Sequence, residues 1–258
     1  MSLDPWMLWA IVGLVSGCVL GLAGAGGGII AIPILIYWGG YSVKAASGYG
    51  LLVISVGAIL TWLPQRKYTN YSVVLILLVF SFLGSYISAP WKAASPDWAL
   101  IILLNFASLF SLYSLWIMRL PAPTALEKHT FLHSVSHSSL GGVLTGILST
   151  MTGLGGGIIM VPWLTSINRL NLSRSVACSL LTIALSAPYS AYVQGYLNLP
   201  TPNLVALGAG ALVASLTIKG LTASVDSNSA AHLLDVLRKL TLTTVILISM
   251  VSTLIRLI

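Results

Sequence analysis

A glycine-rich segment occurs twice in this 258-residue chain, at positions half a chain length apart. The first copy, residues 17–33, reads GCVLGLAGAGGGIIAIP, and the second, residues 146–162, reads GILSTMTGLGGGIIMVP. The two copies align without a gap at an offset of 129 residues. Because glycine in a helix interior costs about 1 kcal/mol relative to alanine, each copy is expected to break the apolar run that contains it. The duplication predicts a chain built from two similar halves.

The composition places these halves in a membrane. The chain is 57% hydrophobic and 7% charged, whereas a soluble domain has about 25% charged residues. We therefore predict an all-α polytopic protein embedded in the lipid bilayer. The net charge of +7 is attributed to Lys and Arg in cytoplasmic loops, so nucleic acid is not an expected partner. Cys18 and Cys178 lie inside apolar runs, which argues against a disulfide framework.

Each half contains one broken apolar element and three runs long enough to span about 30 Å of hydrocarbon. The first half, residues 1–118, has its broken element at 6–39 and spans at 43–63, 71–90 and 98–118. The second half, residues 138–258, has its broken element at 138–167 and spans at 172–193, 201–218 and 239–258. A linker at 119–137, expected in the cytoplasm, joins the two halves.

The basic residues distinguish two topologies for the broken elements. If both elements cross the membrane, the 12 basic residues divide 5 to 7 between the faces. If both turn back as re-entrant helical hairpins, the division is 9 to 3, and only Lys44, Lys92 and Arg256 lie opposite the linker. The positive-inside rule favours the hairpins. The halves are therefore predicted to be inverted repeats in the cell inner membrane, with both termini outside.

The glycine segments are the predicted substrate-binding site. Broken backbone at membrane depth must line a cavity or be buried in protein. Half-helices that begin near the last glycine of each segment direct N–H groups and positive dipole ends at the break, and two such ends facing each other suit a small anion. Close helix packing is the alternative role of these glycines. The glycines assigned to the site are Gly24, Gly26, Gly27, Gly28, Gly153, Gly155, Gly156 and Gly157.

Polar side chains early in the second span of each half are further candidates. Within YSVKAASGYGLL (41–52) and LNLSRSVACSLL (170–181), Lys44 and Arg174 match at an offset of 130, which pairs Ser47-Gly48-Tyr49 with Ala177-Cys178-Ser179. We expect Ser47, Tyr49, Cys178 and Ser179 near the anion. The alternatives are a hydroxyl bonded back to its own helix and a cysteine that acts as a small buried hydrophobe.

Two glutamines are candidate gates. Gln65 and Gln194 are equivalent at an offset of 129 and are expected at opposite membrane faces. Their alternative role is that of surface amides in loops.

The paired G-x-G-G-G-x-x-x-x-P segments, each opening a half of four hydrophobic elements, resemble those of the sulfite exporter TauE/SafE family. The resemblance covers essentially the whole chain. It implies an integral membrane permease for sulfite, organosulfonates or related small anions, with Gly24–Gly28 and Gly153–Gly157 as the central loops. The small-Thr-Ser-Leu-like run of the family is approximated by Ala177-Cys178-Ser179-Leu180 but not by Ser47-Gly48-Tyr49-Gly50.

The predicted function is secondary transport, as export of a small sulfur-containing oxyanion, by one half rocking against the other. No charged residue is placed in the middle of a span, so a carboxylate proton relay is not expected. The inside-negative potential, worth about 2.3 kcal/mol per charge per 100 mV, is sufficient to drive an anion outward. A passive anion channel and a permease for a non-sulfur organic anion are the alternatives. The expected partners are the small anion and the lipid bilayer, and the sequence leaves open whether the protein forms a homo-oligomer.

Enzymatic and metal-dependent functions are not expected. Ser149 and His137 lie near the second broken element, but no nucleophile, base and orienting group form a recognisable set. His129, His133 and His137 share one face if the linker is helical. We interpret that face as solvated or interfacial, so no cofactor or metal is predicted.

Overall fold

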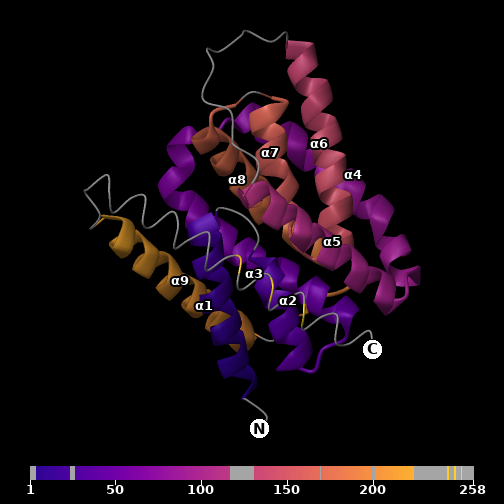
Figure 1. The fold of residues 1–258 in the computed structure, drawn as a ribbon, viewed down its shortest axis with the longest axis vertical. Coiled ribbons are helices and arrows are strands. Elements are labelled where there is room, and N and C mark those ends of the chain that lie inside the picture. The colour runs from indigo at the N-terminus through magenta and orange to yellow at the C-terminus, as the bar shows by residue number, and fades with distance from the viewer. Residues whose placement is uncertain are drawn as a thin grey trace.

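The computed structural model describes residues 4–23, 27–116, 131–168, 170–198 and 201–223, together with 243, 247 and 251. These residues form α-helices and one short 3-10 helix, without a strand among them (Figure 1). Three of their helical segments are long and apolar enough to cross a membrane: Val43–Tyr68, Tyr71–Ala94 and Ser173–Val193. The predicted all-α architecture is confirmed for this part of the chain.

The helices follow one another in the same order in both halves. In the first half they are α1 (Pro5–Ala23), α2 (Gly28–Tyr37), α3 (Val43–Trp62), η1 (Leu63–Tyr68), α4 (Tyr71–Ala94) and α5 (Asp97–Trp116). In the second half they are α6 (Phe131–Thr152), α7 (Gly157–Ser166), α8 (Leu172–Val193) and α9 (Thr201–Ala223). Residues 131–137, assigned to the linker by sequence, are the first turns of α6. Nearly all of the span predicted at 239–258 lies outside the described residues.

The chain folds back at the first glycine segment. A Cβ built on Gly27 would lie 3.1 Å from the carbonyl oxygen of Ser16, whereas 11 residues of continuous helix span about 16 Å. Beyond the turn, Val19 of α1 packs on Ile30 of α2, with Val15 and Ile34 against them. α1 and α2 therefore form an antiparallel helical hairpin.

The second glycine segment produces the same turn. A Cβ on Gly156 would lie 2.9 Å from the carbonyl oxygen of Thr145, and this pair is equivalent to Gly27 and Ser16 at the offset of 129. Further from the turn, Trp163 Nε1 donates to the carbonyl oxygen of His137 at 2.9 Å. α7 therefore runs back along α6. That either hairpin enters and leaves by the same membrane face stays a prediction.

α3 and α8 cross in an antiparallel manner between the two hairpins. At the crossing, Ser55 Oγ donates to the carbonyl oxygen of Ala184 at 2.8 Å, and these residues are equivalent at the offset of 129. Near the start of α3, Gly48 lies against Tyr196, which follows α8. Residues that contact their own equivalents lie on an axis that exchanges the two halves. This contact is the one expected if a pseudo-two-fold axis passes through the crossing, and the inverted repeat itself stays a prediction.

The register of α3 and α8 corrects one part of the sequence comparison. The offset between these helices is 129, not 130, because Ser55 meets Ala184 and the helices begin at Val43 and Leu172. Ser179 is therefore equivalent to Gly50 rather than to Tyr49. The starts of α4 and α9 are 130 residues apart. The second half therefore has one more residue than the first between the start of α8 and the start of α9.

The two halves interlock. α1 packs along α9, and α6 packs along α4, so each hairpin is held by a helix of the other half (Figure 1). Small residues permit this close approach. Ser81 and Ser85 of α4 add hydrogen bonds of 3.1 and 3.3 Å to carbonyl oxygens of α6. The glycines at the two interfaces are equivalent: Gly13 and Gly17 in α1, Gly142 and Gly146 in α6.

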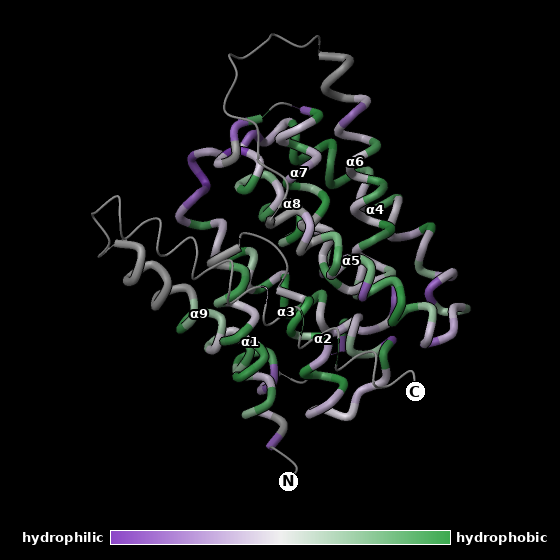
Figure 2. The backbone as a smooth tube through the Cα atoms, in the orientation of Figure 1, coloured by the Kyte–Doolittle hydropathy of each residue, from purple (hydrophilic) through white to green (hydrophobic). Residues whose placement is uncertain are grey.

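The outer surface of the helices is apolar. The strongly hydrophilic residues lie mainly near helix ends and in connecting segments (Figure 2). α4 exposes Leu75, Val79, Leu83 and Ile87 at four-residue spacing, while its opposite face is buried. An apolar stripe of this length on the outside of a helix is expected where the surroundings are lipid.

Candidate functional site

The two glycine segments meet between the hairpins. A Cβ on Gly28 would lie 2.9 Å from the carbonyl oxygen of Gly153 and 3.0 Å from Cα of Leu154. A Cβ on Gly155 would lie 3.1 Å from Ile54 and 3.2 Å from Ile183, which are equivalent residues of α3 and α8. We call Gly27, Gly28 and Gly153–Gly157 the glycine junction. Gly24 and Gly26 lie outside the described residues.

The second segment has a backbone that requires glycine. Gly153, Gly155 and Gly156 have φ angles of 77°, 73° and 67°, in the left-handed region that other residues rarely adopt. Gly27, the equivalent of Gly156, has a φ of −54°. The two segments are therefore equivalent in sequence but differ in local conformation.

The junction presents unpaired backbone donors. Within the described part of the chain, the N–H groups of Gly155, Gly156 and Gly157 make no hydrogen bond. No side chain caps either α2 or α7 at its first residue. Consecutive N–H groups in a turn that leads into a helix N-terminus form a concavity of positive potential. This geometry suits an oxyanion.

Hydroxyl groups around the junction are buried without a hydrogen-bond partner in the described structure. Thr145 lies beside Gly156, and Ser179 lies one helical turn before Ile183. Buried polar groups in proteins are almost always hydrogen-bonded. A ligand or water with several acceptor and donor positions is therefore expected here. The buried hydroxyls of the described residues of α1, α6 and α8 that have no hydrogen-bond partner are Ser16, Thr145, Ser149, Thr150, Ser179 and Ser186.

Ser47 lies at the junction through its backbone. Its carbonyl oxygen and Cα lie directly against Gly153, while its hydroxyl donates back to the carbonyl oxygen of Lys44 at 2.9 Å. The Ser47 hydroxyl is therefore bonded back to its own helix, which was the alternative to a role in anion binding.

Tyr49 and Cys178 have neighbours other than the glycines. The Tyr49 ring packs on Trp9, Tyr41 and Tyr196, with ring centroids 5.4 to 5.8 Å apart. Cys178 accepts a hydrogen bond from the Asn70 N–H at 3.3 Å and lies in an apolar cluster of α4, α7 and α8. These contacts favour structural roles for both side chains.

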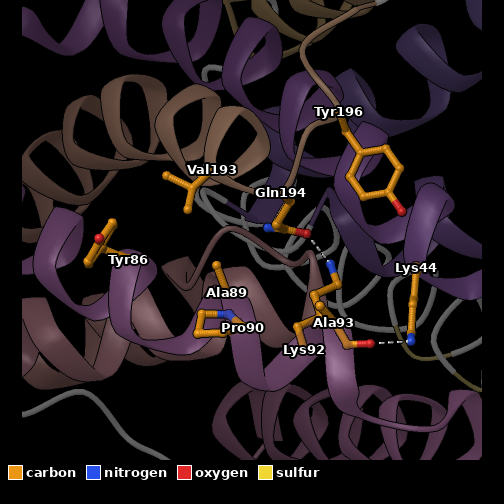
Figure 3. A pocket seen from close by; sticks show the side chains of 9 residues that line it. All are labelled: Lys44, Tyr86, Ala89, Pro90, Lys92, Ala93, Val193, Gln194 and Tyr196. Carbon is orange, nitrogen blue, oxygen red and sulfur yellow. Dashed lines mark hydrogen bonds between the residues drawn. The ribbon is translucent and has the colours of Figure 1, made fainter.

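The two candidate gate residues lie at opposite ends of the α3–α8 crossing. Gln65 in η1 is half-buried and donates to the carbonyl oxygen of Thr61 at 3.4 Å. Gln194 follows α8 and lines a pocket, where its side-chain oxygen accepts a hydrogen bond from Lys92 (Figure 3). Only Gln194 is therefore placed on a cavity by the described contacts.

This pocket, of about 540 Å³, lies where the start of α3 meets the ends of α4 and α8. We name it the lysine pocket after Lys44 and Lys92, which line it with Gln194 and Tyr196. Lys44 donates to the carbonyl oxygen of Ala93 at 2.8 Å (Figure 3). Burial, followed by the charges of Tyr49 and Asp97, raises the pKa of the Tyr196 phenol, so its hydroxyl remains protonated. Sequence reasoning missed this pocket, although two of the three basic residues predicted to lie opposite the linker, Lys44 and Lys92, line it.

Comparison with known proteins identifies the family. The sequence profile described as "Sulfite exporter TauE/SafE" matches residues 9–256. The chain belongs to the sulfite exporter TauE/SafE family. No solved structure is a significant match to this TauE/SafE protein.

Curated relatives of this TauE/SafE protein carry transporter names. A protein of Methanocaldococcus jannaschii, named a probable membrane transporter protein, is 26% identical over 78% of this chain and 80% of its own length. A protein of Xylella fastidiosa with the same description is 29% identical over 65% of both chains. One of Bacillus subtilis is 26% identical over 75% of this chain and 80% of its own length.

The family and these names indicate a membrane transport protein rather than an enzyme. The geometry also excludes the hydrolase pair considered from sequence. His137 and Ser149 both lie on α6 and are 12 residues apart, a separation of about 18 Å along one helix. They cannot act as a nucleophile and its base.

Proposed function

We propose that this TauE/SafE protein is a secondary transporter that exports a small sulfur-containing oxyanion, such as sulfite or an organosulfonate. The anion binds at the glycine junction near the membrane midplane. The observation that carries this proposal is the set of N–H groups on Gly155, Gly156 and Gly157, which make no hydrogen bond in the described part of the chain and follow the contact of Gly28 with Gly153 and Leu154. The description of the family supplies the sulfur chemistry.

An oxyanion satisfies the junction better than a cation or a neutral solute. Sulfite and sulfonate groups each present three oxygens, which accept hydrogen bonds from several directions at once. The N–H groups at the start of α7 and the unpaired hydroxyls of Thr145 and Ser179 are potential donors to them. The partial positive charge at the N-termini of α2 and α7 favours an anion without a charged side chain at the junction.

The same proposal includes an inverted topology. The equivalent helices α3 and α8 are antiparallel, and both are long and apolar enough to span the bilayer. If both cross the membrane, the half at 1–118 and the half at 138–258 have opposite orientations. Two re-entrant hairpins, a cytoplasmic linker at 119–137 and termini outside the inner membrane complete this arrangement.

The packing of α1 on α9 and of α6 on α4 limits which helices can move relative to one another during alternating access. Separation of the two sequence halves would pull α1 from α9 and α6 from α4, which pack through glycine at short distance. We propose instead that α1, α2 and α9 move as one body against α4, α6 and α7. The α3–α8 crossing lies between these bodies.

The test is flux in proteoliposomes challenged with sulfite, sulfoacetate, taurine, acetate and chloride. We expect saturable, electrogenic flux of a sulfur oxyanion, with counterflow of labelled substrate. Transport of acetate alone would indicate a permease for non-sulfur organic anions, and chloride current without saturation or counterflow would indicate a passive channel. Absence of flux for all five compounds would overturn the proposal.

A further inference from the structure

Lys92 is a buried basic residue with no anionic partner among the residues that the structure describes. Its side chain is 2% exposed, and its ammonium group donates to the side-chain oxygen of Gln194. No carboxylate lies within ion-pair distance of it in the part of the chain that the structure describes. Buried lysines are rare unless they are paired with an opposite charge. The described surroundings of Lys92 therefore lack an anion.

The lysine pocket holds a second ammonium group. Lys44 also lines it and bonds only to the carbonyl oxygen of Ala93 among the contacts described. Asp97, at the start of α5, affects the Tyr196 phenol but makes no ion pair with either lysine in the described structure. The pocket is thus cationic, and its volume of about 540 Å³ exceeds what a small oxyanion requires.

We infer that the lysine pocket is a second oxyanion site, which binds the transported anion between Lys44 and Lys92 before or after it occupies the glycine junction. This inference rests on the proposed function for the identity of the anion. Gln194 positions Lys92, because its own amide is fixed by a hydrogen bond of 2.8 Å to the carbonyl oxygen of Ser190. Tyr196 contributes a neutral hydroxyl donor.

The pocket adjoins the junction through the first turns of α3. The carbonyl oxygen of Lys44 accepts the Ser47 hydroxyl, and the Ser47 backbone lies against Gly153. The Tyr196 ring packs on Gly48, the next residue along. About one helical turn therefore separates the pocket from the glycine junction. Tyr196 stands at the boundary between the two sites.

The position of Lys92 favours a free anion over a lipid phosphate. The pocket lies between the ends of three helices, and Lys92 is almost completely enclosed there. In the proposed topology the pocket opens on the face opposite the linker, which is the exit side for an exporter. A cationic site there would collect the anion released from the junction.

The first test measures binding without transport. Purified protein is treated with an amine-reactive reagent in methanesulfonate or in an equal concentration of chloride, and modification of each lysine is followed by mass spectrometry. We expect methanesulfonate to slow modification of Lys92 at least threefold relative to chloride. Lys67, exposed in η1 beyond the opposite end of α3, is the internal control and is expected to react equally in both. Equal modification of Lys92 in the two salts would overturn the inference.

The second test separates the two sites by kinetics. Lys92→Met should raise KM for the transported anion about tenfold with a smaller change in kcat, because it removes a charge-assisted hydrogen bond. Lys92→Arg should restore part of the affinity, and Lys67→Met should have no effect. Lys92→Met alone leaves the side-chain oxygen of Gln194 without its donor, which could destabilise the protein. The double variant Lys92→Met, Gln194→Leu removes that oxygen as well and therefore controls for misfolding. An unchanged KM in both Lys92→Met variants would contradict the second site.

The outcomes distinguish this inference from the proposed function. If the wild type transports no anion, the proposed function fails, while protection of Lys92 still decides whether the pocket binds an oxyanion. If the wild type transports sulfite but Lys92 is neither protected nor important for KM, only the pocket assignment fails. Protection by phosphatidylglycerol nanodiscs relative to phosphatidylcholine nanodiscs, without protection by methanesulfonate, would identify a lipid site and overturn the inference.

Discussion

Gly28 of α2 lies against Gly153 of the second glycine segment, where a Cβ on Gly28 would be 2.9 Å from the Gly153 carbonyl oxygen. The tips of the two hairpins therefore touch through their backbones. In this conformation the contact limits how far apart α2 and the second glycine segment lie. If the proposed site is correct, this separation sets the size of the anion that can bind there.

Alanine at position 28 is expected to lower stability and transport together. Its Cβ would approach two backbone atoms of the other hairpin within 3.0 Å, and overpacking of this kind costs about 1–3 kcal/mol. Thermal unfolding in detergent and sulfite flux measure the two effects. Gly208→Ala in α9 is the control, because nothing lies within 4 Å of a Cβ there and alanine is the better helix former by about 1 kcal/mol. A Gly28→Ala protein as stable as Gly208→Ala would contradict the close contact.

Gly156→Ala should abolish most transport, whereas Gly40→Ala should not. The two glycines have nearly the same φ, 67° and 68°, but a Cβ at 156 meets Thr145 and one at 40 meets nothing within 4 Å. Both substitutions carry a backbone strain of about 1–2 kcal/mol, so the difference in flux reports on the junction. We expect at least a tenfold difference at equal membrane insertion. Equal flux in the two variants would remove the junction as the binding site.

Ser179→Ala should raise the melting temperature of the empty protein and weaken anion binding. The Ser179 hydroxyl is buried without a partner among the described residues, and an unsatisfied buried group costs about 1–3 kcal/mol. Ser190→Ala is the control with the opposite expectation, since the Ser190 hydroxyl bonds to Ser85 at 2.7 Å and to the carbonyl oxygen of Ser186 at 3.1 Å. Ligand-dependent thermal shifts measure both effects. Destabilisation of the empty protein by Ser179→Ala would show that the hydroxyl has another role.

The topology is tested with single cysteines at positions 3 and 122 in a background in which Cys18 and Cys178 are replaced by alanine. Re-entrant hairpins place the two positions on opposite faces of the membrane. A membrane-impermeant thiol reagent applied to right-side-out cells or vesicles should modify Leu3→Cys and leave Ala122→Cys unmodified. Modification of both from the same face would refute the hairpins as re-entrant elements.

The helices and the break at Gly153–Gly157 could be predicted because their signals are local. Glycine weakens the helix where it stands, and apolar runs report helix positions without reference to distant parts of the chain. The match of Gly28 and Gly157 as helix starts follows from the repeat alone. To predict that the two glycine segments touch, we needed only one further assumption, that equivalent segments of the two halves meet at the centre of the protein.

The positions of Tyr49 and Cys178 could not be predicted, because a register error of one residue turns a helical side chain by about 100°. The alignment at 130 paired these residues with Ser179 and Gly48, whereas α3 and α8 keep the offset of 129. The lysine pocket was also missed. Lys44, Lys92 and Gln194 come from the ends of three helices, and no local signal in the sequence joins the two lysines to the glutamine that was predicted as a gate.

The pairing of α1 with α9 also sets a condition on biosynthesis. About 190 residues separate Gly13 from Leu207, its neighbour in the folded protein, and at about 5–20 residues per second the ribosome needs roughly 10–40 s to make them. During that interval the glycine face of α1 has no helix to cover it. The chain must therefore hold its first hairpin in the bilayer, against lipid or an insertion factor, until nearly all of the protein has been translated.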